Sequence, residues 1–214
     1  MMKDLKSMLK DAMILLAITI VAGLVLGVVY QVTKEPIAQQ EAKAKQKACQ
    51  EVFSDAASFE APEGFSEEAA YQVISEQYPN QDINEVVKAV DASGQTLGYV
   101  ITITTHEGYG GDIRFSVGIR NDGTVNGISI LSIAETPGLG MNAESVLVPQ
   151  FENVPATMFT YTKSGSTSES EIDAISGATI TTDAINNGVN AAVSYFNVMY
   201  ASQVVTEGGE TNEE

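Results

Sequence analysis

A short run of small and hydroxyl residues, Asp173 to Thr181, directly precedes an amphipathic helical pattern near the end of the chain. Gly177 and Ala178 in this run add almost no side-chain bulk, so a ligand can approach the backbone closely. The first amide groups of the following helix are unpaired and carry partial positive charge. The run therefore predicts a binding site for a phosphate-bearing group.

A second cluster, Glu-Thr-Pro-Gly-Leu-Gly, occupies residues 135–140 immediately after a β-branched segment. Pro137 fixes one φ angle, while Gly138 and Gly140 permit backbone conformations that other residues avoid. A flat aromatic ligand can lie against such a loop, with backbone amides reaching its polar edge. A plain turn is the alternative interpretation.

A third cluster, Gly108 to Gly111, places Tyr109 among glycines between two segments of strand-like composition. Its glycines favour a tight connection between strands. No specific chemistry follows from this cluster taken alone.

The chain has one cysteine, Cys49, and one histidine, His106. An intrachain disulfide, a four-sulfur metal site and an iron–sulfur site within this chain are therefore excluded. Cys49 lies in an Ala/Lys/Gln/Glu-rich helical pattern that indicates a packing thiol rather than a reactive one. We expect no metal ligands and no catalytic residues, so redox chemistry here needs an organic cofactor.

An apolar run from Ala12 to Val32 contains 21 residues and no charge. At about 1.5 Å per residue it spans roughly 30 Å, the thickness of the hydrocarbon core of a bilayer. A cleavable signal peptide is the competing interpretation, but the run exceeds the usual apolar region of about 7–15 residues. The nearest small-x-small site, at residues 42–44, also lies well beyond it. We expect an uncleaved transmembrane helix at 12–32 after a cytoplasmic tail at 1–11.

The chain carries 11 basic and 28 acidic side chains, a formal net charge of −17. Most acidic residues follow the apolar run, so electrostatic binding of nucleic acid or anionic lipid by the following domain is excluded. The last residues, 206–214, are polar and acidic and predict a disordered tail.

The remaining sequence predicts an α+β domain. Strong helix formers at 37–53 indicate a helix that follows Pro36, a residue tolerated at a helix start, and we assign 33–54 to a helical neck. A short helix is expected at 67–77, and an antiparallel meander follows from β-branched runs and intervening turns. The expected strands lie at 86–90, 97–105, 113–119 and 125–133.

Beyond the meander we expect a helical segment at 142–148, a strand at 157–162 and a loop at 164–170. A final helix is predicted from near Thr182 to about Tyr200, with Thr181 or Thr182 as its cap. Its apolar face is expected to pack on the sheet. That face comprises Ile185, Val189, Ala192, Val193 and Phe196.

Together, the three clusters and the single N-terminal transmembrane helix resemble the G subunit of the Rnf electron-transport complex and, more distantly, the C subunit of the sodium-pumping NADH:quinone reductase. The resemblance runs from this membrane anchor to about residue 200. It implies an extracytoplasmic FMN-binding domain at 55–205. It implies that FMN is esterified through its phosphate to Thr179, framed by Ser176, Gly177 and Ala178. Thr181 is a nearby hydroxyl in the site that is not expected to carry the ester.

The resemblance also assigns the other site residues. Asp173 opens the phosphate motif, either as a recognition residue for the modifying enzyme or as a turn residue. The loop from Glu135 to Gly140 matches the flavin-contacting segment, so Thr136, Gly138 and Leu139 are expected to touch the isoalloxazine. Family members commonly carry basic or His-containing residues just before this loop, whereas this chain has Ser-Ile-Ala at 132–134.

The implied function is an electron relay within a membrane-bound, ion-translocating ferredoxin:NAD oxidoreductase. Its implied partners are membrane and iron–sulfur subunits, together with a flavin transferase that uses FAD and magnesium. The chain has no Gly-x-Gly-x-x-Gly opening a βαβ unit and no Walker sequence, so hydride entry from NADH belongs to another subunit. A subunit of the quinone reductase, a stand-alone flavinylated carrier and an anchored binding module without cofactor remain the alternatives.

Overall fold

The computed structural model describes residues 2–201, with side chains described from residue 8 onward. The chain divides into two compact units, Met1–Ala44 and Lys45–Glu214. The acidic tail expected at 206–214 lies outside the described residues.

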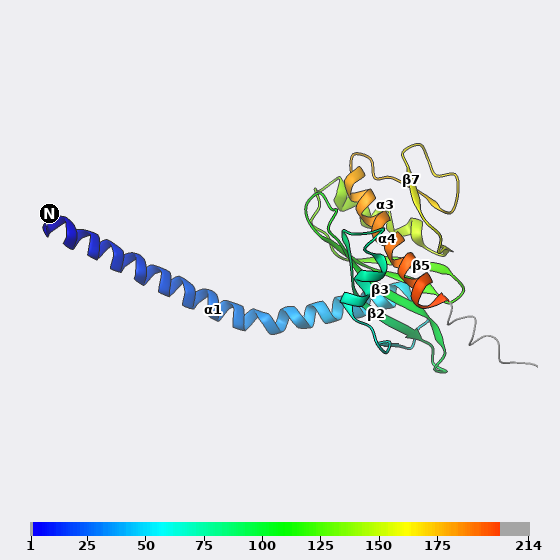
Figure 1. The fold of residues 1–214 in the computed structure, drawn as a ribbon, viewed down its shortest axis with the longest axis horizontal. Helices are drawn as coiled ribbons and strands as arrows, with labels where there is room; N and C mark the ends of the chain where they lie inside the picture. Colours follow the sequence, from blue (N-terminus) through cyan, green and yellow to red (C-terminus); the bar gives the residue numbers. More distant parts are fainter. Residues whose placement is uncertain (1, 202–214) are drawn as a thin grey trace, which may run out of the picture. The chain divides into compact units, whose positions relative to one another are not determined.

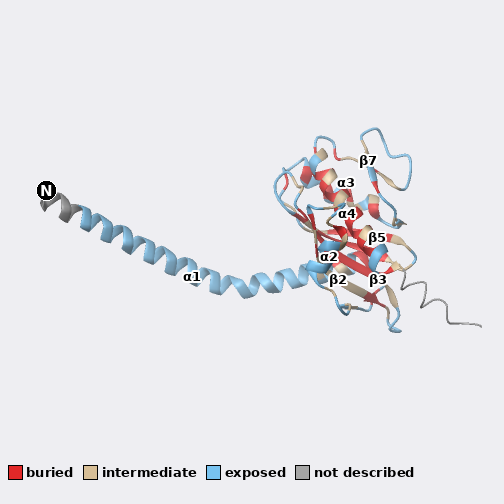
Figure 2. Ribbon diagram, viewed as in Figure 1, coloured by how far each residue is buried: buried red, intermediate tan, exposed pale blue. Residues whose placement is uncertain are grey.

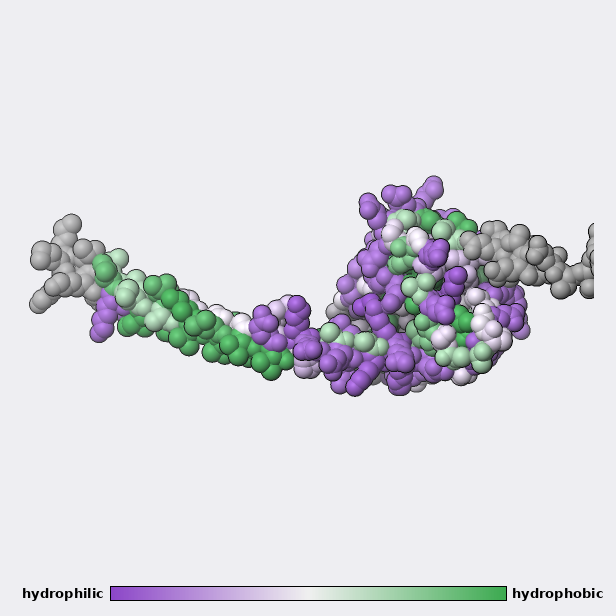
Figure 3. Space-filling view, turned by 90° about the horizontal axis from the view of Figure 1, so that it is seen from below, coloured by the Kyte–Doolittle hydropathy of each residue, from purple (hydrophilic) through white to green (hydrophobic). Residues whose placement is uncertain are grey.

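A single helix, α1 (Met2–Val52), contains the apolar run and the expected neck as far as Val52. By length and composition, its Met8–Val52 part could cross a membrane. The apolar side chains of the run form a continuous hydrophobic surface along this helix (Figure 3). The expectation that a new helix starts at Pro36 is wrong, because Pro36 lies inside α1. A proline removes one backbone hydrogen bond, and the strong helix formers that follow it continue the helix.

The second unit is built on a six-stranded antiparallel sheet with strand order β1-β2-β3-β4-β5-β6, which confirms the expected meander (Figure 1). The turn between β2 and β3 shows why the chain reverses there: the Asp91 carboxylate accepts hydrogen bonds from the backbone N–H groups of Ser93 and Gln95, at 2.8 and 2.9 Å. The strands are β1 (Ser58–Glu60), β2 (Gln81–Val90), β3 (Thr96–Thr105), β4 (Ile113–Arg120), β5 (Thr124–Ser132) and β6 (Val154–Pro155). β1 and β6 were not predicted, and β2 begins at Gln81 rather than at Val86.

Two helices pack with one face of this sheet, α2 (Glu67–Ile74) and the long α4 (Thr179–Met199). Ser66 caps α2 by accepting a hydrogen bond from the backbone N–H of Ala69. The predicted apolar face of α4 is confirmed, since its five residues are at most 2% exposed. Figure 2 shows the buried residues concentrated in α4 and the strands.

The opposite face of the sheet packs against the end of α1. Because neighbouring strand residues point to opposite faces, Ile101 joins the α4 cluster while Val100 joins a second cluster with Val52 and Phe53. Gly118 makes room there, since a Cβ at this position would lie 2.9 Å from Cβ of Val52. The sheet is therefore covered on both faces.

The segment between β5 and α4 is irregular. The helical segment expected at 142–148 is present in three pieces: η1 (Gly140–Asn142), α3 (Ala143–Val146) and η2 (Val148–Phe151). The strand expected at 157–162 is formed only at β7 (Thr160–Thr162), which pairs in parallel with β8 (Glu171–Asp173). β8 was not predicted, because three residues are too few to establish an alternation of polar and apolar side chains.

Candidate cofactor-binding site

A cleft of about 530 Å³ brings together residues from three separate connections of the second unit. These connections are the β3–β4 loop, the loop after β5 and the start of α4. The volume falls within the range of about 300–1,000 Å³ usual for small-molecule sites. The lining residues are Tyr109, Glu135, Thr136, Leu139, Gly140, Gly177, Ala178, Thr179, Ile180 and Thr181.

One carboxylate joins the three connections. Glu135 is only 6% exposed, and its Oε2 accepts a hydrogen bond from Oγ1 of Thr181 at 2.9 Å. Its Oε1 accepts a second hydrogen bond from the backbone N–H of Gly110 at 3.0 Å. Because a buried carboxylate is costly unless its oxygens are paired, these bonds fix the relative positions of the three clusters found in the sequence.

The small residues of the clusters permit close approach between them. A Cβ on Gly140 would lie 2.5 Å from Oγ1 of Thr181 and 2.7 Å from Cβ of Glu135. Gly177 has a left-handed φ of +76°, and a Cβ there would lie 3.1 Å from Cδ2 of Leu139. The two main clusters are thus in direct contact, and a larger residue at either glycine would separate them.

Three threonines at the start of α4 differ in the state of their hydroxyls. Thr181 is 1% exposed and donates to Glu135, whereas Thr182 is fully buried and donates to the carbonyl of Ala178 at 3.0 Å. Thr179 is partly exposed, and its hydroxyl has no hydrogen bond to another residue in the described part of the chain. Only Thr179 among these three therefore offers an accessible hydroxyl to the cleft.

The start of α4 differs from the sequence expectation. The helix begins at Thr179, and Ala178 occupies the N-cap position without a side-chain capping bond. The expectation that Thr181 or Thr182 caps the helix is wrong, because both hydroxyls bond elsewhere. Thr182 instead accepts the backbone N–H of Ile175 at 3.1 Å and so holds the preceding loop from within the first turn.

A smaller hollow of about 300 Å³ lies next to the cleft and shares Gly177 and Thr179 with it. Ser176 lines this hollow rather than the larger cleft. Lys163, from the loop after β7, brings a positive charge to its wall. Thr179 therefore lies where the largely apolar cleft meets a smaller hollow of mixed polarity.

Two of the predicted site residues, Asp173 and Gly138, line neither hollow. Oδ1 of Asp173 accepts the backbone N–H of Ser166 at 2.7 Å, at the end of β8. Gly138 has a left-handed φ of +76°, and its carbonyl accepts a hydrogen bond from Nδ2 of Asn142 at 3.0 Å. In this structure both residues shape the loops that carry the site.

Two lining residues, Tyr109 and Ile180, were not predicted to belong to the site. For Tyr109 the signal was a large aromatic side chain placed among glycines, which we interpreted only as a tight connection. Ile180 had no comparable signal, because its position within the first turn of α4 follows from where the helix begins.

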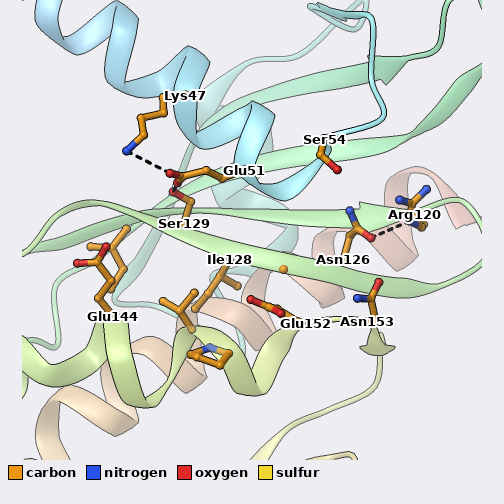
Figure 4. Close-up of a pocket in the computed structure, with 14 residues that line it drawn as sticks. Lys47, Glu51, Ser54, Arg120, Asn126, Ile128, Ser129, Glu144, Glu152 and Asn153 are labelled. Atoms are coloured by element: carbon orange, nitrogen blue, oxygen red, sulfur yellow. Dashed lines mark hydrogen bonds and ion pairs between the residues drawn. The ribbon is translucent and has the colours of Figure 1, made fainter.

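A larger hollow of about 700 Å³ lies elsewhere, between the end of α1, β5 and the η2 segment (Figure 4). Several of its polar side chains pair with one another. Nζ of Lys47 lies 3.2 Å from Oε1 of Glu51, and Ser129 donates to Oε2 of Glu51, a bond that lowers the pKa of this carboxyl. Arg120 similarly donates to Asn126 at 2.7 Å. None of the predicted site residues lines this hollow, so the smaller cleft is the better candidate.

Comparison with known proteins places the cleft within a recognised class. Residues 108–194, which include all the lining residues of the cleft, match the model of the FMN-binding domain. The fold and the site therefore define an FMN-binding domain, here following an apolar N-terminal helix. Residues 1–52 match a second model, the RnfG N-terminal region.

Similar proteins cover nearly the whole chain. The G subunit of the sodium-translocating ferredoxin:NAD oxidoreductase complex of Acetobacterium woodii is 32% identical over 195 residues, which are 90% of this chain and 93% of that protein. The G subunit of the ion-translocating oxidoreductase complex of Methanosarcina acetivorans is 31% identical over 91% of this chain and 97% of that protein. The chain belongs to the family of G subunits of ion-translocating oxidoreductase complexes, which confirms the resemblance found in the sequence.

One further relative and one solved structure are also similar to this chain. The G subunit of the proton-translocating ferredoxin:NAD oxidoreductase complex of Clostridium ljungdahlii is 30% identical over 81% of this chain and 83% of that protein. Among solved structures, the crystal structure of Shewanella oneidensis NqrC is similar with a TM-score of 0.47 and 18% identity, covering 72% of this chain and 73% of that one.

Proposed function

We propose that this chain is the electron-relay subunit of an ion-translocating ferredoxin:NAD oxidoreductase complex, and that it carries FMN through a phosphoester on Thr179. Membership of the G-subunit family and the match to the FMN-binding domain support the relay role. The observation that supports Thr179 as the attachment site is its accessible hydroxyl, which lies at the junction of the two hollows.

The residues around this junction fit the parts of FMN. Leu139 and Ile180 offer apolar surface for a flat ring system, and the small residues Gly177 and Ala178 leave room beside it. The phosphate would lie near the first N–H groups of α4 and the charge of Lys163, both of which favour an anion. Bound FMN would supply one- and two-electron transfer at this site.

Attachment at Thr179 is a phosphoryl-transfer reaction carried out by a flavin transferase. A bond forms between Oγ1 of Thr179 and the phosphorus of the FMN half of FAD, and the pyrophosphate bond to AMP breaks. AMP leaves, and the hydroxyl proton passes to a base of the transferase. The reaction needs a solvent-facing hydroxyl, which the partly exposed Thr179 has and the buried Thr181 lacks. Asp173, which lies outside both hollows, is proposed as a recognition residue for this enzyme.

A covalent bond suits an extracytoplasmic domain. Outside the cytoplasm there is no FMN pool from which a dissociated cofactor could be replaced, so an ester prevents loss by dilution. We place the short N-terminal tail in the cytoplasm and the domain on the other side of a single membrane span at 12–32. The direct electron partners are then membrane and iron–sulfur subunits of the same complex.

Intact mass measurement tests the proposal directly. The full chain is produced together with a flavin transferase, purified in detergent and measured before and after protease digestion. We expect a mass increase equal to one FMN phosphoryl group, on the peptide that contains Thr179. An unmodified mass, or a modification confined to a peptide without Thr179, contradicts the proposal.

A further inference from the structure

The β3–β4 connection presents an aromatic side chain on a fixed backbone. Tyr109 is 72% exposed and lines the cleft. On one side of it, a Cβ on Gly108 would lie 2.1 Å from the carbonyl oxygen of Gly111. On the other side, a Cβ on Gly110 would lie 2.2 Å from the carbonyl oxygen of Ala134. Both neighbours of Tyr109 are therefore held too closely for any residue but glycine.

A hydrogen bond attaches the same loop to the site. The backbone N–H of Gly110 donates to Oε1 of Glu135, the carboxylate that also accepts from Thr181 near the start of α4. The position of the Tyr109 backbone is thus linked to the segment that carries Thr179. A rigid connection of this kind limits the movement of the aromatic ring relative to the cleft.

The cleft gathers other exposed apolar side chains. Leu139 is 41% exposed and Ile180 is 49% exposed, and both line the cleft together with Tyr109. Single exposed apolar residues are common, but several around one concave site mark a surface that a ligand covers. A flat ring system would bury all three.

We propose that Tyr109 stacks on the isoalloxazine of the FMN and forms an aromatic wall of its site. This inference rests on the proposed function, because it takes the ring to be attached through Thr179. Offset stacking of aromatic rings contributes beyond the burial of area alone, so Tyr109 would hold the ring in one orientation. The rigid glycine loop then serves to present this side chain, rather than only to reverse the chain.

Stacking on tyrosine has a spectroscopic consequence. A phenol in contact with an excited flavin transfers an electron to it and takes the electron back, so the flavin returns to its ground state without emitting light. The flavin fluorescence of the folded protein is then short-lived, and it recovers when unfolding separates the two rings. This readout does not depend on the activity of a complex.

The test compares fluorescence lifetimes of the native, flavinylated full chain. The variants are Tyr109→Leu, which removes the aromatic ring, and Tyr109→Phe, which keeps its size but is a much poorer electron donor. Tyr71→Leu is the matched control, because Tyr71 is another exposed tyrosine, on α2, that does not line the cleft. The covalent flavin content of each protein is measured after denaturation.

We expect both Tyr109 variants to retain covalent flavin and to show a lifetime several times longer than the wild type, with Tyr71→Leu unchanged. If Tyr109→Leu does not fold, Tyr109→Phe alone decides the result. A full flavin content with an unchanged lifetime in the Tyr109 variants overturns this inference and leaves the attachment at Thr179 intact. A wild-type protein without covalent flavin overturns the proposed function, and the inference with it.

Discussion

Oγ1 of Thr181 donates a 2.9 Å hydrogen bond to Oε2 of Glu135, across 46 residues of sequence. Both groups are almost fully buried, so water cannot replace either partner. The bond joins the loop after β5 to the first turn of α4, and thereby joins the two clusters that the sequence had marked as separate features. The bond also explains why the Thr181 hydroxyl has a structural role, whereas the hydroxyl of nearby Thr179 is accessible.

Removal of the Glu135 carboxylate should loosen the cleft. Glu135→Ala leaves the Thr181 hydroxyl buried without its partner and frees the Gly110 N–H, at a cost of about 1–3 kcal/mol in the free energy of unfolding. Thermal unfolding of the purified chain checks the stability, and denatured flavin content checks the site. Glu85→Ala, which removes a half-exposed partner of Lys45, is the control and should change stability by much less. Equal effects of the two variants would argue against a linking role for Glu135.

Gly140 should tolerate no side chain. In Gly140→Ala the new Cβ would overlap Oγ1 of Thr181 and Cβ of Glu135, so we expect about 1–3 kcal/mol of destabilisation and a lower fraction of flavinylated protein. Gly138→Ala is the matched control in the same loop, since a Cβ there meets nothing within 4 Å. It should cost only the strain of a left-handed residue, about 1–2 kcal/mol, and keep its flavin. A fully flavinylated Gly140→Ala protein would contradict the close contact between the clusters.

His106 should make stability depend on pH. Its Nε2 lies 2.9 Å from Oδ2 of Asp82 and its Nδ1 lies 2.9 Å from Oδ1 of Asp112. The hydrogen bond to Asp82 and then that to Asp112 raise the pKa of His106 above its ordinary 6.5, because both carboxylates favour the protonated ring.

The raised pKa fixes the direction of the effect. The stabilisation is fully present below pH 6.5 and is lost as pH rises through the higher pKa of the folded state. Thermal unfolding of the wild type and of His106→Gln should therefore differ most at acidic pH and converge at alkaline pH. A difference that is constant across this range would show that the two carboxylates do not act on the protonated ring.

Cys49 should be unreactive in the folded chain. Burial, and next the nearby charge of Glu85, raise the pKa of its thiol from 9.0 to about 11. At neutral pH the thiolate is then about a hundredfold rarer than for an unshifted thiol, so alkylation should be slower by a similar factor. Rates of alkylation in the native and the denatured full chain measure this ratio. Comparable rates in both states would show that the thiol is not protected.

Much of the architecture could be predicted because it depends on local patterns. The anchor, the meander and the apolar face of α4 follow from run length, from β-branched composition and from the spacing of residues such as Ile185 and Val189. The parallel pair of β7 and β8 and the start of α4 could not be predicted in this way. They depend on partners distant in sequence, as when Thr182 bonds the loop before α4 instead of capping the helix.

The candidate site, too, could be predicted only in part from the sequence. The sequence marked Thr179 and Leu139 through small-residue and glycine motifs, and both line the cleft. It did not assign Tyr109 to the site, because only the folded chain places the β3–β4 loop beside the other two clusters. Asp173, for which the sequence allowed either recognition by the modifying enzyme or a turn role, accepts a hydrogen bond from the backbone of Ser166 at the end of β8.

The central claim, one flavin on one threonine, is tested most directly by in-gel fluorescence of denatured protein. Full-length wild type, Thr179→Ala, Thr179→Ser and Thr181→Ala are each produced with a flavin transferase and compared at equal protein load. We predict fluorescence in the wild type and in Thr181→Ala, no fluorescence in Thr179→Ala, and retention in Thr179→Ser wherever the transferase accepts a serine hydroxyl. Fluorescence that persists in the denatured Thr179→Ala protein would contradict the assignment.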